Sequence, residues 1–400
     1  MKLNSKAKTA ILIGTLCSVS YFAVYIARNI LSAVSPQMLE AGISQSYLDT
    51  AASVYFYVYA VGQLINGFIG DKIKARYMIS FGLVLAGICN IIYPSLAKSE
   101  VGSIVVYGMV GFFLAMIYGP MTKVVAENVE PKYVARCSMG YEFAALFGSP
   151  TAGLLAALLP MYFVFRVGGG ILLFMGVVAF VCFLVLERRG FVTYGQYKPQ
   201  QKGGGKIKVL FKYNIVKFCF IAIITGVVRT SVVFWLPAYM KDYLEFSEST
   251  SSLLFSVVTL AISMTTFIAV FVYERLKSMD KTILLMFSIA AVAFLAVWLV
   301  KQPIVNLICL VTAIMGSGCV ASMLWCKYCP SLRDTGMVSS VTGFLDFLSY
   351  MAAGTANLVN AVAKIEWSNL ILIWLGLMVF GVIIALPYDF IIGKIKAKRA

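Results

Sequence analysis

Long apolar runs separated by short polar connections occupy almost the whole chain. A helix that crosses a bilayer needs about 20 mostly apolar residues, and twelve runs have that length. They cover approximately residues 9–34, 46–69, 77–97, 102–125, 136–159, 162–186, 215–238, 250–273, 280–300, 303–326, 337–362 and 367–393. Helices are expected because they satisfy every backbone polar group within their own segment. The pattern predicts an all-α membrane protein with twelve transmembrane helices.

The composition is typical of a polytopic membrane protein, and the positions of the cations orient it. Hydrophobic residues make up 61% of the chain and charged residues 12%, with a mean hydropathy of +0.89, whereas soluble domains are about 25% charged. Lys and Arg cluster in the N-terminal segment, in alternate loops and in the tail, and cytoplasmic loops are enriched in these residues. We expect a multi-pass protein of the cell (inner) membrane with both termini cytoplasmic. The formal charge of +16 does not indicate nucleic-acid binding, because topology explains where the cations lie.

Landmarks of the first half of the chain recur in the second half at a nearly constant offset. Arg28 and Arg229 lie 201 positions apart. Offsets of 201 to 204 also relate Pro36 to Pro237, Lys123 to Lys327, and Glu142 to Asp346. A duplicated six-helix unit explains these matches. We predict two pseudo-symmetric six-helix bundles, 1–186 and 215–400, joined by a flexible cytoplasmic linker loop, 187–214, with Gly203-Gly204-Gly205 inside it.

Arg28 and Arg229 are the residues in these spans that most need an explanation. A charge at the bilayer centre costs about 2.5 to 3.5 kcal/mol on insertion scales, so intramembrane arginines usually face a partner, a cavity or a substrate. A guanidinium offers a fixed fork of donors that fits phosphate or carboxylate oxygens. The duplicated placement therefore favours an anion-binding site, and the alternative is an arginine that pairs with an acid and only holds helices together.

Polar stripes accompany the first arginine. Tyr21, Tyr25, Arg28 and Ser32 share one helical face of the first span, and Tyr55, Tyr59, Gln63 and Asn66 share one face of the second. A helix surrounded only by lipid would not need such a stripe. These faces are expected to line a polar cavity.

Three segments carry a resemblance to a known family. Gly67 to Arg76 resembles the loop signature of glycine, aspartate and basic residues of the major facilitator superfamily. Tyr25 to Met38, with Tyr59 and Gln63 after it, and Arg229 to Tyr239 resemble the organophosphate:phosphate antiporter family of glycerol phosphate and hexose phosphate transporters. The resemblance implies the major facilitator fold, with one arginine of each half on the substrate's phosphate. It implies a substrate site of Arg28, Arg229, Tyr21, Tyr25, Tyr59 and Gln63, and a gating loop that contains Gly67, Asp71 and Arg76.

Some positions depart from that family. Ala145 and Gln63 stand where the family usually has a histidine in span five and some members have a lysine in span two. Glu142 and Asp346 are acids within apolar sequence. With Lys123, they are candidates for setting the charge of the cavity and the coupling. The acids could pair with the arginines or Lys123, bind a proton, hold a substrate amine, or cap helix breaks.

These features predict a secondary active transporter of a small organic anion. We expect a phosphorylated metabolite to be exchanged for inorganic phosphate by rocker-switch alternating access. The alternatives are a proton-coupled symporter of an organic carboxylate such as a sugar acid, and a non-transporting anion sensor. An enzyme is not expected, since the chain has no histidine and no nucleophile with a recognisable base. We expect no cofactor, no catalytic or metal-binding residue, and a monomer in the lipid bilayer; the substrate's identity is not determined by the sequence.

Overall fold

The structure, a computed structural model, describes residues 5–96, 99–196, 210–363 and 365–386. Within these ranges all regular secondary structure is helical. The fold class predicted from the apolar runs is confirmed by this architecture. Eight helical segments of the described chain are long and apolar enough to cross a membrane, and each coincides with one of the twelve predicted spans. They are Lys6–Ser35, Thr50–Gly70, Ala75–Leu96, Glu100–Asn128, Met161–Arg188, Met279–Leu299, Pro303–Thr335 and Trp367–Ala385.

The helices group into two compact units. Unit 1 comprises residues 1–213 and 325–350, and unit 2 comprises residues 214–324 and 351–400. The helices of unit 1 are α1 (Ser5–Arg28), α2 (Ile30–Glu40), α3 (Gln45–Gly70), α4 (Ala75–Ile92), η1 (Tyr93–Leu96), α5 (Glu100–Leu114), α6 (Tyr118–Asn128), α7 (Pro131–Leu158), α8 (Met161–Arg188), α16 (Cys329–Ser331), η4 (Leu332–Thr335) and the first half of α17 (Val338–Ala363). The predicted linker centre, Gly203-Gly204-Gly205, lies outside the described residues, and the predicted division into bundles 1–186 and 215–400 stays a prediction.

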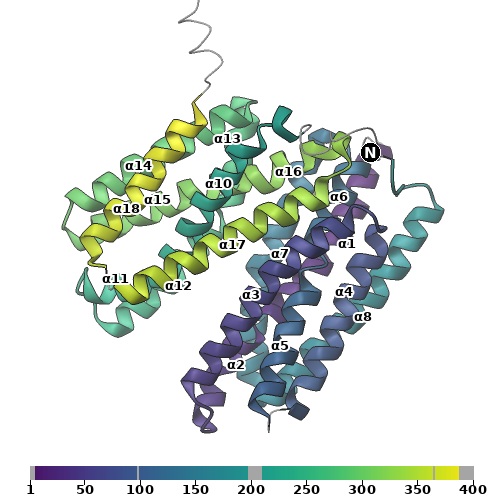
Figure 1. Ribbon diagram of the computed structural model, residues 1–400, viewed down its shortest axis with the longest axis horizontal. Helices are drawn as coiled ribbons and strands as arrows, with labels where there is room; N and C mark the ends of the chain where they lie inside the picture. Colours follow the sequence, from purple (N-terminus) through teal and green to yellow (C-terminus); the bar gives the residue numbers. More distant parts are fainter. Residues whose placement is uncertain (1–4, 97–98, 197–209, 364, 387–400) are drawn as a thin grey trace, which may run out of the picture. The chain divides into compact units, whose positions relative to one another are not determined.

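Unit 2 contains the remaining helices, which are drawn in teal, green and yellow in Figure 1. They are α10 (Ile215–Val227), η2 (Val228–Val232), α11 (Val233–Asp242), α12 (Glu248–Ser263), α13 (Thr265–Leu276), α14 (Met279–Leu299), α15 (Pro303–Met323), the second half of α17, and α18 (Trp367–Ala385). The segment η3 (Leu324–Tyr328) joins α15 to α16. The four predicted spans outside the eight membrane-length segments coincide with α7, with α10 to α11, with α12 to α13, and with α17.

Local chemistry sets several helix starts. Ser44 precedes α3, and its side chain accepts a hydrogen bond from the Tyr47 amide. Ser99 precedes α5, and its side chain accepts a hydrogen bond from the Gly102 amide. Pro131 and Pro303 begin α7 and α15, where a missing N–H costs nothing because the first-turn amides have no partner within the helix.

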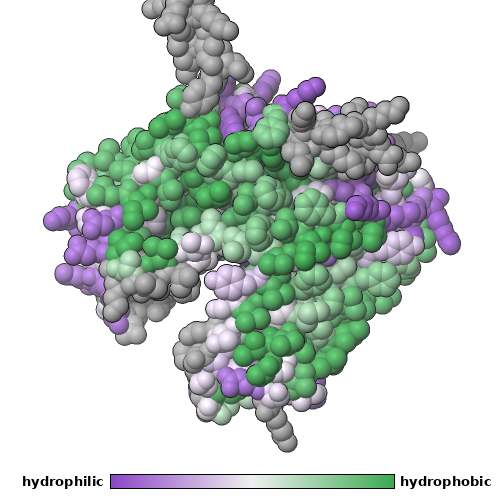
Figure 2. Space-filling view, in the orientation of Figure 1, coloured by the Kyte–Doolittle hydropathy of each residue, from purple (hydrophilic) through white to green (hydrophobic). Residues whose placement is uncertain are grey.

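Apolar side chains cover the outside of unit 1 as well as its core. The face seen in Figure 2 is mainly hydrophobic along the helices of unit 1, and hydrophilic residues gather toward the helix ends. Phe81 on α4 and Phe174 on α8 are both more than half exposed. An extended hydrophobic exterior of this kind fits a lipid environment rather than water. Inside, α4 and α8 approach closely at Gly87 and Gly169, where an added Cβ on Gly87 would lie 2.8 Å from the carbonyl oxygen of Gly169.

The two arginines singled out in the sequence lie at helix irregularities, each in its own unit. Arg28 is the last residue of α1, and the chain is interrupted at Asn29, whose side-chain amide donates to the Tyr25 carbonyl oxygen at 2.7 Å. Arg229 lies in η2, a π-helical turn between α10 and α11. Such turns are often found at functional sites.

Candidate functional site

An aromatic cage surrounds Arg28 in unit 1. The rings come from α1, from α3 and from α17, and their centroids lie 5.0 to 5.6 Å from the guanidinium carbon. They belong to Tyr25, Phe56, Tyr59 and Tyr350. Arg28 Nη2 also donates a hydrogen bond to the Tyr350 hydroxyl at 2.6 Å. The groups that contact Arg28 among the described residues are therefore uncharged.

Helical spacing explains how the cage forms. Tyr25 precedes Arg28 by three positions on α1, and Phe56 and Tyr59 are three positions apart on α3, so each pair lies on one helical face. Cation–π contacts contribute about 0.5 to 2 kcal/mol, more when they are desolvated. A guanidinium has five donors, so one phenol hydroxyl does not saturate it. The cage holds the charge in place, and the hydrogen bonds to the described residues leave donors available for an anion.

Two further predicted residues extend this cluster. Gln63, which is buried, donates from Nε2 to the Tyr59 hydroxyl at 2.7 Å. Tyr21 packs edge-on against Tyr25, with ring centroids 5.1 Å apart. The structure thus brings together five of the six residues predicted for the substrate site: Arg28, Tyr21, Tyr25, Tyr59 and Gln63. The sixth, Arg229, belongs to unit 2.

Of the two predicted acids, the structure describes the side chain of Asp346 but not that of Glu142. Asp346 is buried on α17, four positions before Tyr350, so the two residues share a helical face. Glu142 lies on α7, and its side chain is outside the described part of the structure. Asp346 is therefore a neighbour of the cage, while a role for Glu142 stays a prediction.

The predicted gating loop contacts the start of α17 within unit 1. Asp71 lies directly after α3, and its carboxylate accepts hydrogen bonds from the backbone amides of Ser339 at 3.0 Å and Ser340 at 2.8 Å. These amides belong to the first turn of α17, where donors lack partners within the helix and the helix dipole favours a negative charge. Asp71 therefore caps α17, although it lies 268 positions before Ser339 in the sequence.

A close approach of α3 and α17 accompanies this cap. A Cβ added to Gly67 would lie 2.9 Å from the Ser339 carbonyl oxygen and 3.1 Å from the Gly343 Cα. Side chains at these glycines would push the helices apart. This observation gives the predicted Gly67 a physical role, since a larger residue there would disturb the Asp71 cap.

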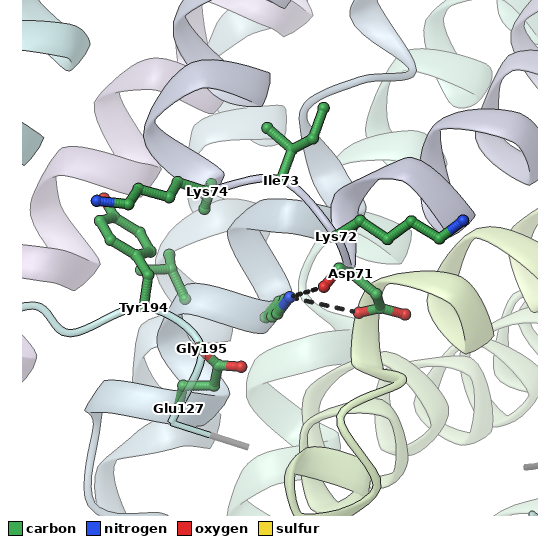
Figure 3. Close-up of a pocket in the computed structure, with 10 residues that line it drawn as sticks. Asp71, Lys72, Ile73, Lys74, Glu127, Tyr194 and Gly195 are labelled. Atoms are coloured by element: carbon green, nitrogen blue, oxygen red, sulfur yellow. Dashed lines mark hydrogen bonds and ion pairs between the residues drawn. The ribbon is translucent and has the colours of Figure 1, made fainter. Parts of the chain in front are cut away.

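Lys123 lies with the gating loop rather than within the Arg28 cage. Its Nζ donates to the carbonyl oxygens of Gly70 at 3.2 Å and Asp71 at 2.8 Å, and lies 3.8 Å from an Asp71 carboxylate oxygen. Asp71 and Lys123 line a pocket of about 230 Å³. Figure 3 shows the loop from Asp71 to Lys74 on one side of this pocket and Tyr194 with Gly195 on another.

Arg76, the third predicted loop residue, fastens the loop to α8. Its Nη1 lies 2.6 Å from a carboxylate oxygen of Glu187, and its guanidinium lies over the rings of Tyr77 and Phe180. Lys74 pairs with the other Glu187 oxygen at 2.7 Å. The Arg76 side chain is 7% exposed, so this ion pair is largely removed from water.

Burial raises the pKa of the Asp71 carboxyl, because desolvation outweighs the hydrogen bonds from Ser340 and Ser339 and the nearby Lys123 charge. The carboxylate is therefore easier to protonate than an exposed aspartate. A proton on Asp71 would remove its charge from the first turn of α17.

Sequence reasoning did not identify two contributors to the cage, Tyr350 and Phe56. Tyr350 is 322 positions from Arg28, and no local pattern links residues that far apart. One signal was present: Asp346 and Tyr350 are four positions apart and share a helical face. Phe56 is an apolar neighbour of the polar stripe on α3 and carries no separate signal.

Comparison with solved structures defines the class of fold. FucP, a major facilitator superfamily transporter solved in the outward conformation, matches with a TM-score of 0.71 at 13% identity, covering 94% of this chain and 98% of that structure. The human organic anion transporter MFSD10 (TETRAN) matches with a TM-score of 0.64 at 15% identity, covering 96% of this chain and all of that one. At such identities the likeness establishes the fold alone.

The profile of the Major Facilitator Superfamily matches residues 17–356, and the chain belongs to this family of transporters. The glycerol-3-phosphate transporter of Bacillus subtilis is 22% identical over 384 residues, covering 88% of this chain and 86% of the relative. The membrane sensor protein UhpC of Salmonella typhimurium is 24% identical over 251 residues, covering 56% of this chain. The chain spans about half the length of this sensor, 55%. The resemblance to organophosphate:phosphate antiporters noted from the motifs is confirmed at low identity.

Proposed function

We propose that the chain is a secondary active transporter of a small organic anion, a phosphate ester exchanged for inorganic phosphate across the inner membrane. The observation that carries this proposal is the Arg28 cage, in which a cation is held among uncharged aromatic groups and makes one side-chain hydrogen bond to the described residues. The similarity to a glycerol-3-phosphate transporter supports a phosphorylated substrate. The direction of both termini toward the cytoplasm is part of the proposal and rests on the distribution of Lys and Arg.

Phosphate suits this site chemically. Arginine binds phosphate oxygens in a bidentate way, and each hydrogen bond to a charged group contributes about 1.5 to 3 kcal/mol. The Tyr25 and Tyr59 rings stand beside the guanidinium and can accommodate the carbon skeleton of an ester. Arg229 is proposed as the matching cation of the second half, because it occupies the repeat-related position.

Among the described residues, the groups that contact Arg28 directly are uncharged, which favours exchange over net transport. A cation that no contacting group neutralises resists enclosure in an empty carrier, because desolvation of the charge is not offset. A bound dianion supplies the missing charge and permits reorientation of the loaded carrier. The carrier is then expected to cross the membrane loaded in both directions.

Counterflow in proteoliposomes tests the proposal. Vesicles loaded with unlabelled inorganic phosphate should take up labelled phosphate, and glycerol 3-phosphate inside the vesicles should stimulate that uptake. Arg28→Lys and Arg229→Lys should each abolish counterflow while the purified protein stays folded, since lysine cannot make the bidentate contact. Arg166→Lys, an exposed arginine of α8, is the matched control. Full transport by both site variants would contradict the arginine site.

The same proteoliposomes distinguish two alternative functions from the proposed exchange. A carboxylate symporter requires uptake that follows an imposed pH gradient, with sugar acids as substrates and Asp346 as a candidate proton carrier. A sensor, a class to which the relative UhpC belongs by its name, requires that phosphate esters raise the melting temperature without any flux.

A further inference from the structure

A groove runs between α1 and α7 in unit 1, away from the Arg28 cage. Its volume is about 430 Å³, which falls within the range of about 300 to 1,000 Å³ typical of small-molecule sites. From α1 it is lined by Ile11, Thr15 and Val19, which recur every fourth position and so form one face of the helix. Arg136 and Gly140, also four positions apart, line it from α7.

The groove is a slot with an apolar wall and a floor of small residues. Gly14 forms part of the floor, and a Cβ added there would lie 3.0 Å from the Cys137 sulfur. Ile11 is 54% exposed and Val19 is 45% exposed, so the wall faces outward. Large apolar side chains exposed on a membrane-spanning helix are suited to contact with hydrocarbon chains.

The same apolar face continues along α7 beyond the groove. Phe143 and Phe147 follow Gly140 by three and seven positions, which places them on one side of the helix. Both are nearly half exposed, and their ring centroids are 4.7 Å apart. The groove and the two rings therefore lie along one side of α7, on a path from Arg136 toward the middle of the bilayer.

The other end of the path is basic. Arg136 lies in the second turn of α7 and is exposed. Lys6 and Lys132, both largely exposed, pair with Glu130 just before this helix. The distribution of Lys and Arg assigns this end to the cytoplasmic face, where anionic lipids give the membrane surface a negative potential.

We propose that this groove binds one anionic phospholipid, with the lipid phosphate on Arg136 and one acyl chain along Ile11, Thr15 and Val19 toward Phe143. The arginine fork matches a phosphodiester, and the slot matches a hydrocarbon chain. A free phosphate ion would use the cation but not the slot, whereas a zwitterionic lipid would use the slot but bring its own cation to Arg136. This inference is independent of the transported substrate.

Native mass spectrometry of the full chain in detergent tests the site. Dioleoyl phosphatidylglycerol should stay bound at one molecule per protein, more tightly than dioleoyl phosphatidylcholine. Arg136→Gln and Thr15→Phe, which remove the cation and fill the slot, should each weaken phosphatidylglycerol binding at least tenfold, the equivalent of about 1.4 kcal/mol. Matched controls are Arg188→Gln, an exposed arginine at the end of α8, and Thr312→Phe, an exposed threonine of α15; both should bind like wild type.

Any one of the following outcomes would overturn the proposed lipid site. Equal retention by the groove variants and their controls, or equal binding of the two lipids, would show that the groove selects no anionic lipid. Competition by inorganic phosphate alone would assign Arg136 to a free anion. A protein dimer that Thr15→Phe dissociates, with no lipid retained, would assign the groove to a second copy of the chain. Circular dichroism of each variant separates loss of binding from loss of fold.

Discussion

The hydroxyl of Tyr350 offers a direct test of how the Arg28 cage works. It accepts a hydrogen bond from Arg28 Nη2 at 2.6 Å, while its ring lies 5.4 Å from the guanidinium carbon. Tyr350→Phe removes the hydroxyl and keeps the ring. If an anion binds by replacing this phenol on the guanidinium, the substitution should strengthen anion binding, because there is no longer a hydrogen bond to break.

The size of the effect follows from the contact. A hydrogen bond to a charged group contributes about 1.5 to 3 kcal/mol, and Arg28 is only partly buried, so the lower end applies. About 1.4 kcal/mol corresponds to a tenfold change in affinity. Tyr350→Phe should therefore lower the Kd for inorganic phosphate roughly tenfold.

Isothermal titration calorimetry of the purified protein with inorganic phosphate measures this change. Tyr57→Phe is the matched control, since Tyr57 lies on α3 and is 48% exposed, and it should leave the Kd unchanged. Phosphate binding that is unchanged or weaker in Tyr350→Phe would refute the replacement of the phenol by the anion. Weaker binding would instead indicate that the hydroxyl binds the anion together with Arg28.

Further predictions concern the gating loop and its ion pairs. Asp71→Ala removes both acceptors at the first turn of α17 and should lower the free energy of unfolding by about 1 to 2 kcal/mol, which denaturant unfolding would measure; a loss no larger than that of an exposed alanine substitution would contradict the cap. The folded-state pKa of Asp71 is raised, so the folded protein binds a proton at Asp71 more tightly than the unfolded chain does. The stability that comes from this proton is fully present below the unfolded pKa of about 4, and it is lost as pH rises through the folded pKa. The melting temperature of wild type relative to Asp71→Asn should thus fall across that window, and parallel pH profiles would refute this. Glu187→Gln leaves the buried Arg76 without its charged partner and should cost about 3 kcal/mol, whereas Glu130→Gln, at exposed pairs, should cost at most about 1 kcal/mol; equal losses would be evidence against a buried role for the Arg76 pair.

The sequence alone determined the class of this protein. Apolar runs of bilayer length predict helices because every backbone group must find its partner within the segment, and that constraint is local. The polar stripe on the first span was also readable, since Tyr21, Tyr25 and Arg28 follow helical spacing. The loop signature around Asp71 and the repeat of Arg28 at Arg229 were sufficient to indicate the superfamily.

Only the tertiary structure decided which residues contact one another. It placed Lys123 on the carbonyl groups of the gating loop rather than within the Arg28 cage, because the reach of a side chain depends on how α6 packs beside α3. It also placed Tyr350 on Arg28, and Ser339 and Ser340 on Asp71. The contacts of Tyr350, Ser339 and Ser340 join parts of the chain more than 250 positions apart. Helical periodicity shows which face a residue occupies, but the partner of that face is chosen by the packing of whole helices.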